Sequence, residues 1–213
     1  MMLSVTLIIL LLTCVISFSA FSNQRMLDEL IFYPPAVTYQ KQWYRFFSCG
    51  LIHADFLHLA FNMYTFYLFG NLVEGAFGEI FGASGKILYG ICYITAIGVS
   101  LLPTYSQHKT DSYYRSLGAS GAVSAIIFIG IILYPTMGLG IFPIPVHIPA
   151  FVFGPIYLII SAYLSKKGGG NINHSAHIWG AIYGVVFIVI TAQFMSSFNP
   201  IAHFFQEVMG YLR

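Results

Sequence analysis

The chain has 213 residues, of which 58% are hydrophobic and 8% are charged, and its formal net charge is +2. A soluble domain carries roughly 25% charged residues, so this chain has too few to cover a surface that faces water. The few basic residues form no cluster, which gives no support to nucleic-acid binding. The scattered cysteines Cys14, Cys49 and Cys92 indicate neither a disulfide framework nor a metal site.

The apolar residues fall in blocks of about 18–22, the length that crosses the hydrocarbon core of a bilayer as a helix. A membrane β-barrel would instead alternate apolar and polar residues with a period of two. The sequence therefore predicts an all-α polytopic membrane protein, with residues 1–213 forming a single transmembrane domain. The six predicted spans are residues 3–20, 57–77, 86–104, 119–137, 149–165 and 175–196.

Three segments need separate interpretation. Met1–Ala20 ends in small residues, as a signal peptide does, but it lacks a positively charged start, so we expect a retained first helix. The long first loop, 21–56, mixes aromatic and polar residues and is expected to lie in the membrane interface. The tail, 197–213, is too short to span and is expected to be interfacial or cytoplasmic. Its apolar stripe predicts an interfacial helix, with Ile201, Phe204, Phe205, Val208 and Leu212 on one face.

The tetrapeptide Gly-Ala-Ser-Gly occurs twice, at 82–85 and at 118–121. If side A is the membrane face reached after the first span, spans two, four and six all begin at side A. Ser120 then opens span four at side A, whereas Ser84 lies at side B in the loop between spans two and three. His177 opens span six, so it shares a membrane depth with Ser120 and not with Ser84. The second tetrapeptide is therefore the candidate site, and the first is interpreted as a turn or helix start.

The surroundings of Ser120 suit a nucleophile. Serine reacts readily only when a base takes its proton, and His177 is placed to be that base. Gly118 and Gly121 permit unusual backbone angles and close approach of a substrate. A serine at a helix start also has free N–H groups and the helix dipole beside it, which stabilise an anion. Taken alone, Ser120 would be a helix-packing serine and His177 a core histidine, so it is their shared depth that favours catalysis.

Other polar residues and glycines gather at the same depth. His58 and Asn62 open span two at i, i+4 spacing, which places them on one helical face. They could donate hydrogen bonds to an oxyanion, or alternatively form hydrogen bonds between helices. His53 is expected to help fold the first loop. Gly180 and Gly184 predict a close-packing face on span six, directed toward span four.

No acidic residue is available for a catalytic triad. The acids lie outside the predicted spans, apart from Glu74 at the boundary of span two. The motif also differs from the nucleophile elbow Gly-x-Ser-x-Gly, because Ala122 stands where that pattern needs glycine. A dyad of Ser120 and His177 is the economical interpretation.

These motifs resemble the rhomboid family of intramembrane serine proteases, and the resemblance covers nearly the whole chain as a minimal six-helix core. The matching stretches are His53-Ala-Asp-Phe-Leu-His58-Leu-Ala-Phe-Asn62, Gly118-Ala-Ser120-Gly121-Ala-Val, and Ala176-His177-Ile-Trp-Gly180 with Gly184. The resemblance implies a rhomboid-like bundle with Ser120 as nucleophile and His177 as general base. It implies an oxyanion hole of His58, Asn62 and the Ser120 backbone N–H. It also implies transmembrane proteins as substrates, a bilayer around the bundle, and no cofactor or metal.

Two positions depart from the family's pattern and bear on the substrate pocket. The family often has an aromatic residue four positions after the serine, stacked on the histidine, and here that position is Ser124. The position two after the histidine is often small, and here it is Trp179. We expect Trp179 to fill the space that Ser124 leaves. The predicted substrate-pocket and helix-packing residues are Gly118, Gly121, Ser124, Trp179, Gly180 and Gly184.

The leading hypothesis is therefore an intramembrane serine endopeptidase. The first alternative is a catalytically silent relative that binds membrane clients, although such proteins usually lack the serine or the histidine. The second is a transporter or proton relay through His58 and His177, which would be expected to show paired intramembrane acids or broken-helix repeats.

The charges and the resemblance disagree on orientation. The positive-inside rule places side A in the cytoplasm, because its loops carry more basic residues (Arg25, Lys41, Arg45, Lys109, Arg115, Lys166 and Lys167) than side B does (Lys86 and Arg213). The resemblance implies a bacterial inner-membrane protein whose site opens to the exterior. Since the charges are spread over long loops, we expect the family's orientation.

Overall fold

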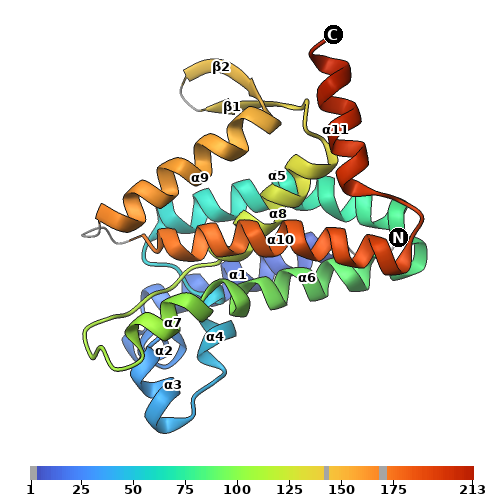
Figure 1. The fold of residues 1–213 in the computed structure, drawn as a ribbon. Coiled ribbons are helices and arrows are strands. Elements are labelled where there is room, and N and C mark those ends of the chain that lie inside the picture. Colours follow the sequence, from blue (N-terminus) through green and yellow to red (C-terminus); the bar gives the residue numbers. More distant parts are fainter. Residues whose placement is uncertain (1–3, 142–143, 168–171) are drawn as a thin grey trace.

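A central helix, α8, is surrounded by the other long helices in the computed structural model (Figure 1), which describes residues 4–141, 144–167 and 172–213. Helix α8 packs against α5, α6, α9 and α10, and α1 packs against α5 on the outside of the bundle. The bundle helices are α1 (Val5–Phe21), α5 (Phe56–Phe81), α6 (Gly85–Ser100), α8 (Ser120–Leu133), α9 (Ala150–Lys167) and α10 (His174–Met195).

Shorter elements connect these helices. Four of them follow α1 and precede α5, namely α2 (Gln24–Leu30), α3 (Pro34–Gln40), α4 (Arg45–Ser48) and the 3₁₀ turn η1 (Cys49–Leu51). The remaining connections are η2 (Gly82–Ser84), α7 (Leu102–His108) and the strands β1 (Gly138–Ile141) and β2 (Ile144–Pro149). The two strands pair in antiparallel orientation, with Gly138 opposite Pro149. The tail forms α11 (Pro200–Tyr211), which confirms the predicted helix.

Each predicted span coincides with a helix, but three boundaries were wrong. Helix α5 continues to Phe81, beyond the predicted end at residue 77. The third predicted span divides into α6 and α7 next to Pro103, and α8 ends at Leu133, shortly before Pro135. Pro103 has no N–H to continue the hydrogen bonds of α6, and it is tolerated in the first turn of α7. Pro135 disfavours helical geometry in the residue before it, Tyr134, where α8 has ended. The short β1–β2 hairpin that follows was not predicted from the sequence.

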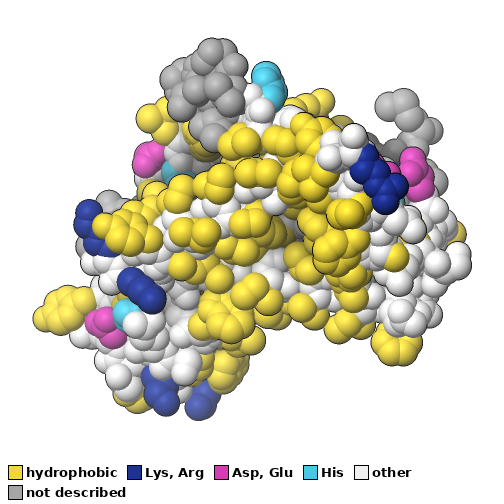
Figure 2. All heavy atoms as spheres, turned by 45° about the horizontal axis from the view of Figure 1, so that its top comes forward, with side chains coloured by type: hydrophobic (Ala, Val, Ile, Leu, Met, Phe, Trp, Pro, Cys, Tyr) yellow, Lys and Arg dark blue, Asp and Glu magenta, His cyan; other side chains and the backbone are white. Residues whose placement is uncertain are grey.

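Among the described residues, two helical stretches are long and apolar enough to cross a bilayer. These are the adjoining elements Phe56–His108 and the helix His174–Met195, while α1 and α8 are apolar but shorter. Figure 2 shows hydrophobic side chains over most of one face of the molecule, with few charged side chains between them. The exposed groups include Leu11 and Val15 of α1 and Ile159 of α9. The outside of this helical bundle is therefore apolar, although the count of six crossings stays a prediction.

Helix α8 lies at the centre because it has no polar face. All but two of its residues are buried, as expected for a helix that is apolar nearly all round. Two glycines of α10 allow that helix to approach closely: a Cβ atom on Gly180 would collide with the Gly121 carbonyl oxygen, and one on Gly184 with the Ala125 carbonyl oxygen. Helices α8 and α10 therefore lie backbone against backbone at these two glycines.

The one acid expected at a span boundary anchors α1. Glu74 is buried within α5, where its carboxylate accepts hydrogen bonds from Ser4 Oγ (2.7 Å), Val5 N (2.9 Å) and Thr6 N (2.9 Å). These N–H groups lie at the positive end of the α1 dipole, where a carboxylate is favourable. Glu74 therefore holds α1 on the bundle.

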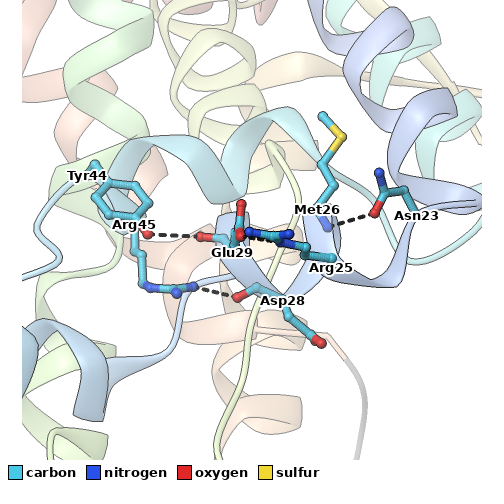
Figure 3. A network of polar contacts seen from close by, with 7 residues as sticks. All are labelled: Asn23, Arg25, Met26, Asp28, Glu29, Tyr44 and Arg45. Atoms are coloured by element: carbon cyan, nitrogen blue, oxygen red, sulfur yellow. Dashed lines mark hydrogen bonds and ion pairs between the residues drawn. The ribbon is translucent and has the colours of Figure 1, made fainter.

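A buried arginine organises the long first loop (Figure 3). Arg45 Nη1 donates to the carbonyl oxygens of Asp28 (2.8 Å) and Ile31 (2.7 Å), while the Tyr44 hydroxyl donates to the Glu29 carbonyl (3.2 Å). Carbonyl groups at the end of α2 would otherwise lack partners. Tyr44 and Arg45 thus fix the end of α2 against the chain that leads to α5.

A glycine at the α8–α10 contact and a glycine that touches no neighbour should respond in opposite ways to substitution by alanine. Gly184→Ala introduces a methyl group against backbone atoms of Ala125, so we expect the free energy of unfolding to fall by about 1–3 kcal/mol. Gly78→Ala in α5 meets no atom within 4 Å, and its better helix propensity is expected to raise stability by about 1 kcal/mol. Thermal unfolding in detergent measures both, and equal effects would contradict this packing.

Candidate active site

Ser120 and His177 meet at the starts of α8 and α10. His177 Nε2 lies 2.8 Å from Ser120 Oγ, although the residues are 57 positions apart in sequence. This distance suits a hydrogen bond through which the hydroxyl proton can move to the imidazole. The glycine contacts between α8 and α10 allow the two helices to lie close enough for this bond.

The start of α8 presents free backbone donors beside Ser120. Its first hydrogen bond runs from Val123 N to the Ala119 carbonyl (3.0 Å), so the N–H groups of Ser120, Gly121 and Ala122 have no acceptor within the helix. The chain enters the helix through Gly118, whose φ of +107° favours glycine. These donors and the helix dipole form an environment suited to an anion.

His58 reaches this turn, and Asn62 lies one helical turn further along α5. A Cβ atom on Gly118 would stand 2.9 Å from His58 Cε1 and 3.0 Å from Nε2, so the imidazole lies directly against Gly118. Asn62 is buried and its Nδ2 donates to the His58 carbonyl oxygen (3.0 Å). Within the described residues, no hydrogen bond joins either side chain to Ser120. The structure therefore brings His58 to the serine turn and points the Asn62 amide at its own helix.

A small cavity lies beside Ser120. Of the predicted pocket and packing residues, Gly118 and Gly121 line it, and Ser124, Trp179, Gly180 and Gly184 do not. Its other lining residues come from four parts of the chain, and they include Cys49, Ser100, Leu117, Asn173 and Ala176.

The expectation for Trp179 was wrong, and Tyr157 of α9 occupies the position beside Ser124. Trp179 is 45% exposed, because two residues turn about 200° around a helix and direct it away from His177. Ser124 is buried, and its Oγ lies 2.9 Å from Tyr157 Oη. The Tyr157 ring stacks near His177 with centroids 6.3 Å apart and an interplanar angle of 22°. Tyr157 was not among the predicted site residues, since it belongs to no motif.

His53 connects the first loop to the serine turn, as well as folding that loop. It is fully buried, with Nδ1 2.9 Å from Ser17 Oγ and Nε2 3.5 Å from the Ala119 N–H. Ser17 Oγ in turn donates to the Leu51 carbonyl (2.9 Å), so a neutral His53 that carries its proton on Nδ1 satisfies every bond. Burial and the nearby His58 lower the pKa of His53 to about 3.

Ser84 lies at the other end of the bundle. It belongs to η2, which follows the last residue of α5, whereas His58 lies near the first. A helix rises 1.5 Å per residue, so the 26 residues of α5 separate the two ends by roughly 39 Å. The two copies of Gly-Ala-Ser-Gly are therefore far apart, and only the second one has a histidine beside its serine among the described residues.

A serine is hydrogen-bonded to a histidine inside an apolar helical bundle. These features are those of a membrane-embedded protein with a candidate hydrolase site. The family model of the Rhomboid domain matches residues 40–194. The chain therefore belongs to the rhomboid family, whose members are embedded in membranes, and the resemblance drawn from the motifs is confirmed.

Individual relatives come from bacteria and from plant organelles. The chain is 27% identical over 157 residues to the Rhomboid protease GlpG of Haemophilus influenzae, which covers 74% of each protein. It is 28% identical to Rhomboid-like protein 11, chloroplastic, of Arabidopsis thaliana, over 73% of this chain and 55% of that protein. It is 35% identical to RHOMBOID-like protein 12, mitochondrial, of the same plant, over 63% of this chain and 42% of that protein. The chain thus spans about half the length of the two plant relatives.

The neutral state of His53 predicts a pH dependence of stability. Its pKa is lowered from 6.5 to about 3, so its stabilising contribution is complete above pH 6.5 and is lost as pH falls toward 3. We expect His53→Gln to unfold at a lower temperature at neutral pH, and to lose less stability than the wild type on acidification. Unfolding midpoints in detergent between pH 7 and pH 4 measure this. Parallel pH curves for the two proteins would contradict the assignment.

Proposed function

We propose that this protein is an intramembrane serine endopeptidase that cleaves transmembrane segments of other proteins. The observation that carries the proposal is the 2.8 Å hydrogen bond between Ser120 Oγ and His177 Nε2 at the starts of two packed helices. Family membership supports it, because relatives of this chain include proteins named as proteases.

The proposed reaction follows from the positions of the donors and the base. His177 Nε2 takes the hydroxyl proton of Ser120 as Oγ attacks the peptide carbonyl, and then gives that proton to the departing amine. The oxyanion that forms meets the backbone N–H of Ser120 at the helix start, with His58 and Asn62 as side-chain donors. For Asn62 this role requires its amide to exchange the His58 carbonyl for the substrate. A water molecule then hydrolyses the acyl-enzyme, and no metal or cofactor takes part.

In the proposed arrangement, residues 1–213 form one domain that crosses the bilayer six times. The crossing helices are α1, α5, α6, α8, α9 and α10. Helix α8 has 14 residues and is about 21 Å long, shorter than the hydrocarbon core of about 30 Å. Ser120, at its first residue, would then lie below the membrane surface. Water would reach it from side A, where a cavity of about 430 Å³ is lined by residues such as His108, Asn173 and His174.

The proposed location is the inner membrane of a bacterium, with side A toward the exterior and α11 at the opposite interface. Bacterial relatives support this choice. The excess of basic residues on side A is the argument for the reverse orientation.

A serine-reactive fluorophosphonate probe tests the catalytic proposal against the catalytically silent alternative. We expect the wild type to be labelled, because His177 activates the Ser120 hydroxyl. Ser120→Ala and His177→Ala should each remove the label. Ser84→Ala is the matched control in the other Gly-Ala-Ser-Gly copy, and its labelling should equal that of the wild type. Labelling that survives Ser120→Ala would sink the proposal.

Single cysteines test the orientation. The native Cys49 and Cys92 are buried and Cys14 is partly buried, so a Cys14→Ser background should react weakly. We expect Tyr113→Cys, at a position that is 92% exposed on side A, to react with a membrane-impermeant maleimide in intact cells. Arg213→Cys on side B should react only after the cells are opened. The reverse pattern would place side A in the cytoplasm.

A further inference from the structure

The imidazole of His177 has a partner for one nitrogen and none for the other. Its Nε2 bonds to Ser120 Oγ, while no side chain or carbonyl among residues 4–141, 144–167 and 172–213 makes a hydrogen bond to Nδ1. In serine–base pairs a third group usually orients the base through that second nitrogen. The terminal torsion of histidine is broad, so without such a bond the ring needs another constraint to keep Nε2 directed at the serine.

Ring contacts supply that constraint from two sides. Tyr157 of α9 stacks on His177 at a centroid distance of 6.3 Å and 22°, and His174 packs edge-on at 5.6 Å and 80°. Both distances lie in the range of favourable aromatic pairs. His174 precedes His177 by one turn of the same helix, so it moves with the base. Tyr157 is the contact that comes from another helix and fixes the imidazole relative to the rest of the bundle.

The Tyr157 ring is itself held in place. Its hydroxyl lies 2.9 Å from Ser124 Oγ, and Ser124 is 2% exposed on α8, one turn after Ser120. Its ring also packs near Phe128, with centroids 5.7 Å apart. Tyr157 thus bridges the helix of the nucleophile and the ring of the base. Ser124 is small enough to leave room for this ring and polar enough to bind its hydroxyl.

We propose that Tyr157, bound to Ser124, is the positioning residue that orients His177 for proton transfer with Ser120. The proposal rests on the proposed function of Ser120 and His177. Once His177 accepts the proton it is a cation, and the nearly parallel Tyr157 ring, with its centroid 6.3 Å away, attracts that state more than the neutral one. The contribution therefore arises during the reaction and not in binding, so it raises the rate constant of the chemical step.

Saturation kinetics of fluorophosphonate labelling separate these two quantities, namely the maximal inactivation rate constant and the probe concentration at half-saturation. For Tyr157→Leu we expect the rate constant to fall about tenfold, with half-saturation within about twofold of the wild type. Tyr157→Phe keeps the ring and should stay within about threefold. Tyr163→Leu, a tyrosine on the same helix that is 65% exposed, is the matched control and should match the wild type. Tyr157→Met, whose flexible unbranched chain adapts to the space of the lost ring, repeats the test if the leucine variant does not fold.

The outcomes distinguish this inference from the proposed function. If the wild type is not labelled at Ser120, the proposed function itself fails. If the wild type is labelled and the folded leucine and methionine variants react at its rate, Tyr157 does not position the base. If Tyr157→Phe loses as much as Tyr157→Leu, the stacked ring is not the cause and the proposal is overturned. Unfolding midpoints measured on the same samples show which variants are folded.

Discussion

The close approach of α10 to α8 is the constraint on which the site depends. Gly180 and Gly184 present no side chain to the backbone of Gly121 and Ala125, so the two helix starts lie near enough for His177 Nε2 to stand 2.8 Å from Ser120 Oγ. Between apolar helices in a bilayer there is little hydrophobic drive, and association depends on close packing of small residues. The same glycines that pack the bundle therefore set the geometry of the candidate dyad.

Several polar groups inside this apolar bundle are paired with structural partners, although the buried hydroxyls of Thr13 and Tyr93 make no hydrogen bond within the described residues. Glu74 accepts from the start of α1, His53 links Ser17 to Ala119, and Ser124 pairs with Tyr157. An unpaired polar group in such surroundings is expensive, so each pair also fixes the position of its helix or loop. Two of these pairs adjoin the Ser120 turn. The scaffold and the site are thus stabilised by the same contacts.

Much of this arrangement could be predicted because it follows from the lengths and the order of the apolar blocks in the sequence. Apolar block lengths predicted a helix for each span, and the parity of the spans placed Ser84 and Ser120 at opposite ends of the bundle. The i, i+4 spacing of Gly180 and Gly184 predicted the α8–α10 contact. Local periodicity carries this information, since residues one turn apart share a helical face.

The contacts that were not predicted depend on which helices become neighbours in the fold. The spacing of residues along one sequence does not show which helices those are. Tyr157 lies on α9, and nothing around it shows that it would face His177, whereas Trp179 was closer in sequence and pointed away. Glu74 could be seen as an acid at a span boundary, but its partners are 68–70 residues earlier in the chain. The β1–β2 hairpin was missed because the apolar run before it continued past the end of α8.

Proteolysis in a bilayer tests the central claim most directly. The purified full-length chain would be reconstituted in lipid vesicles with fluorescently labelled single-pass proteins that carry small residues near one membrane surface. The account predicts that the wild type cleaves at least one of them within its membrane segment, that Ser120→Ala and His177→Ala cleave none, and that Ser84→Ala cleaves as the wild type does. Cleavage that persists in Ser120→Ala would contradict the assignment of the nucleophile. A wild type that is labelled by the fluorophosphonate but cleaves no membrane segment would contradict the proposed endopeptidase.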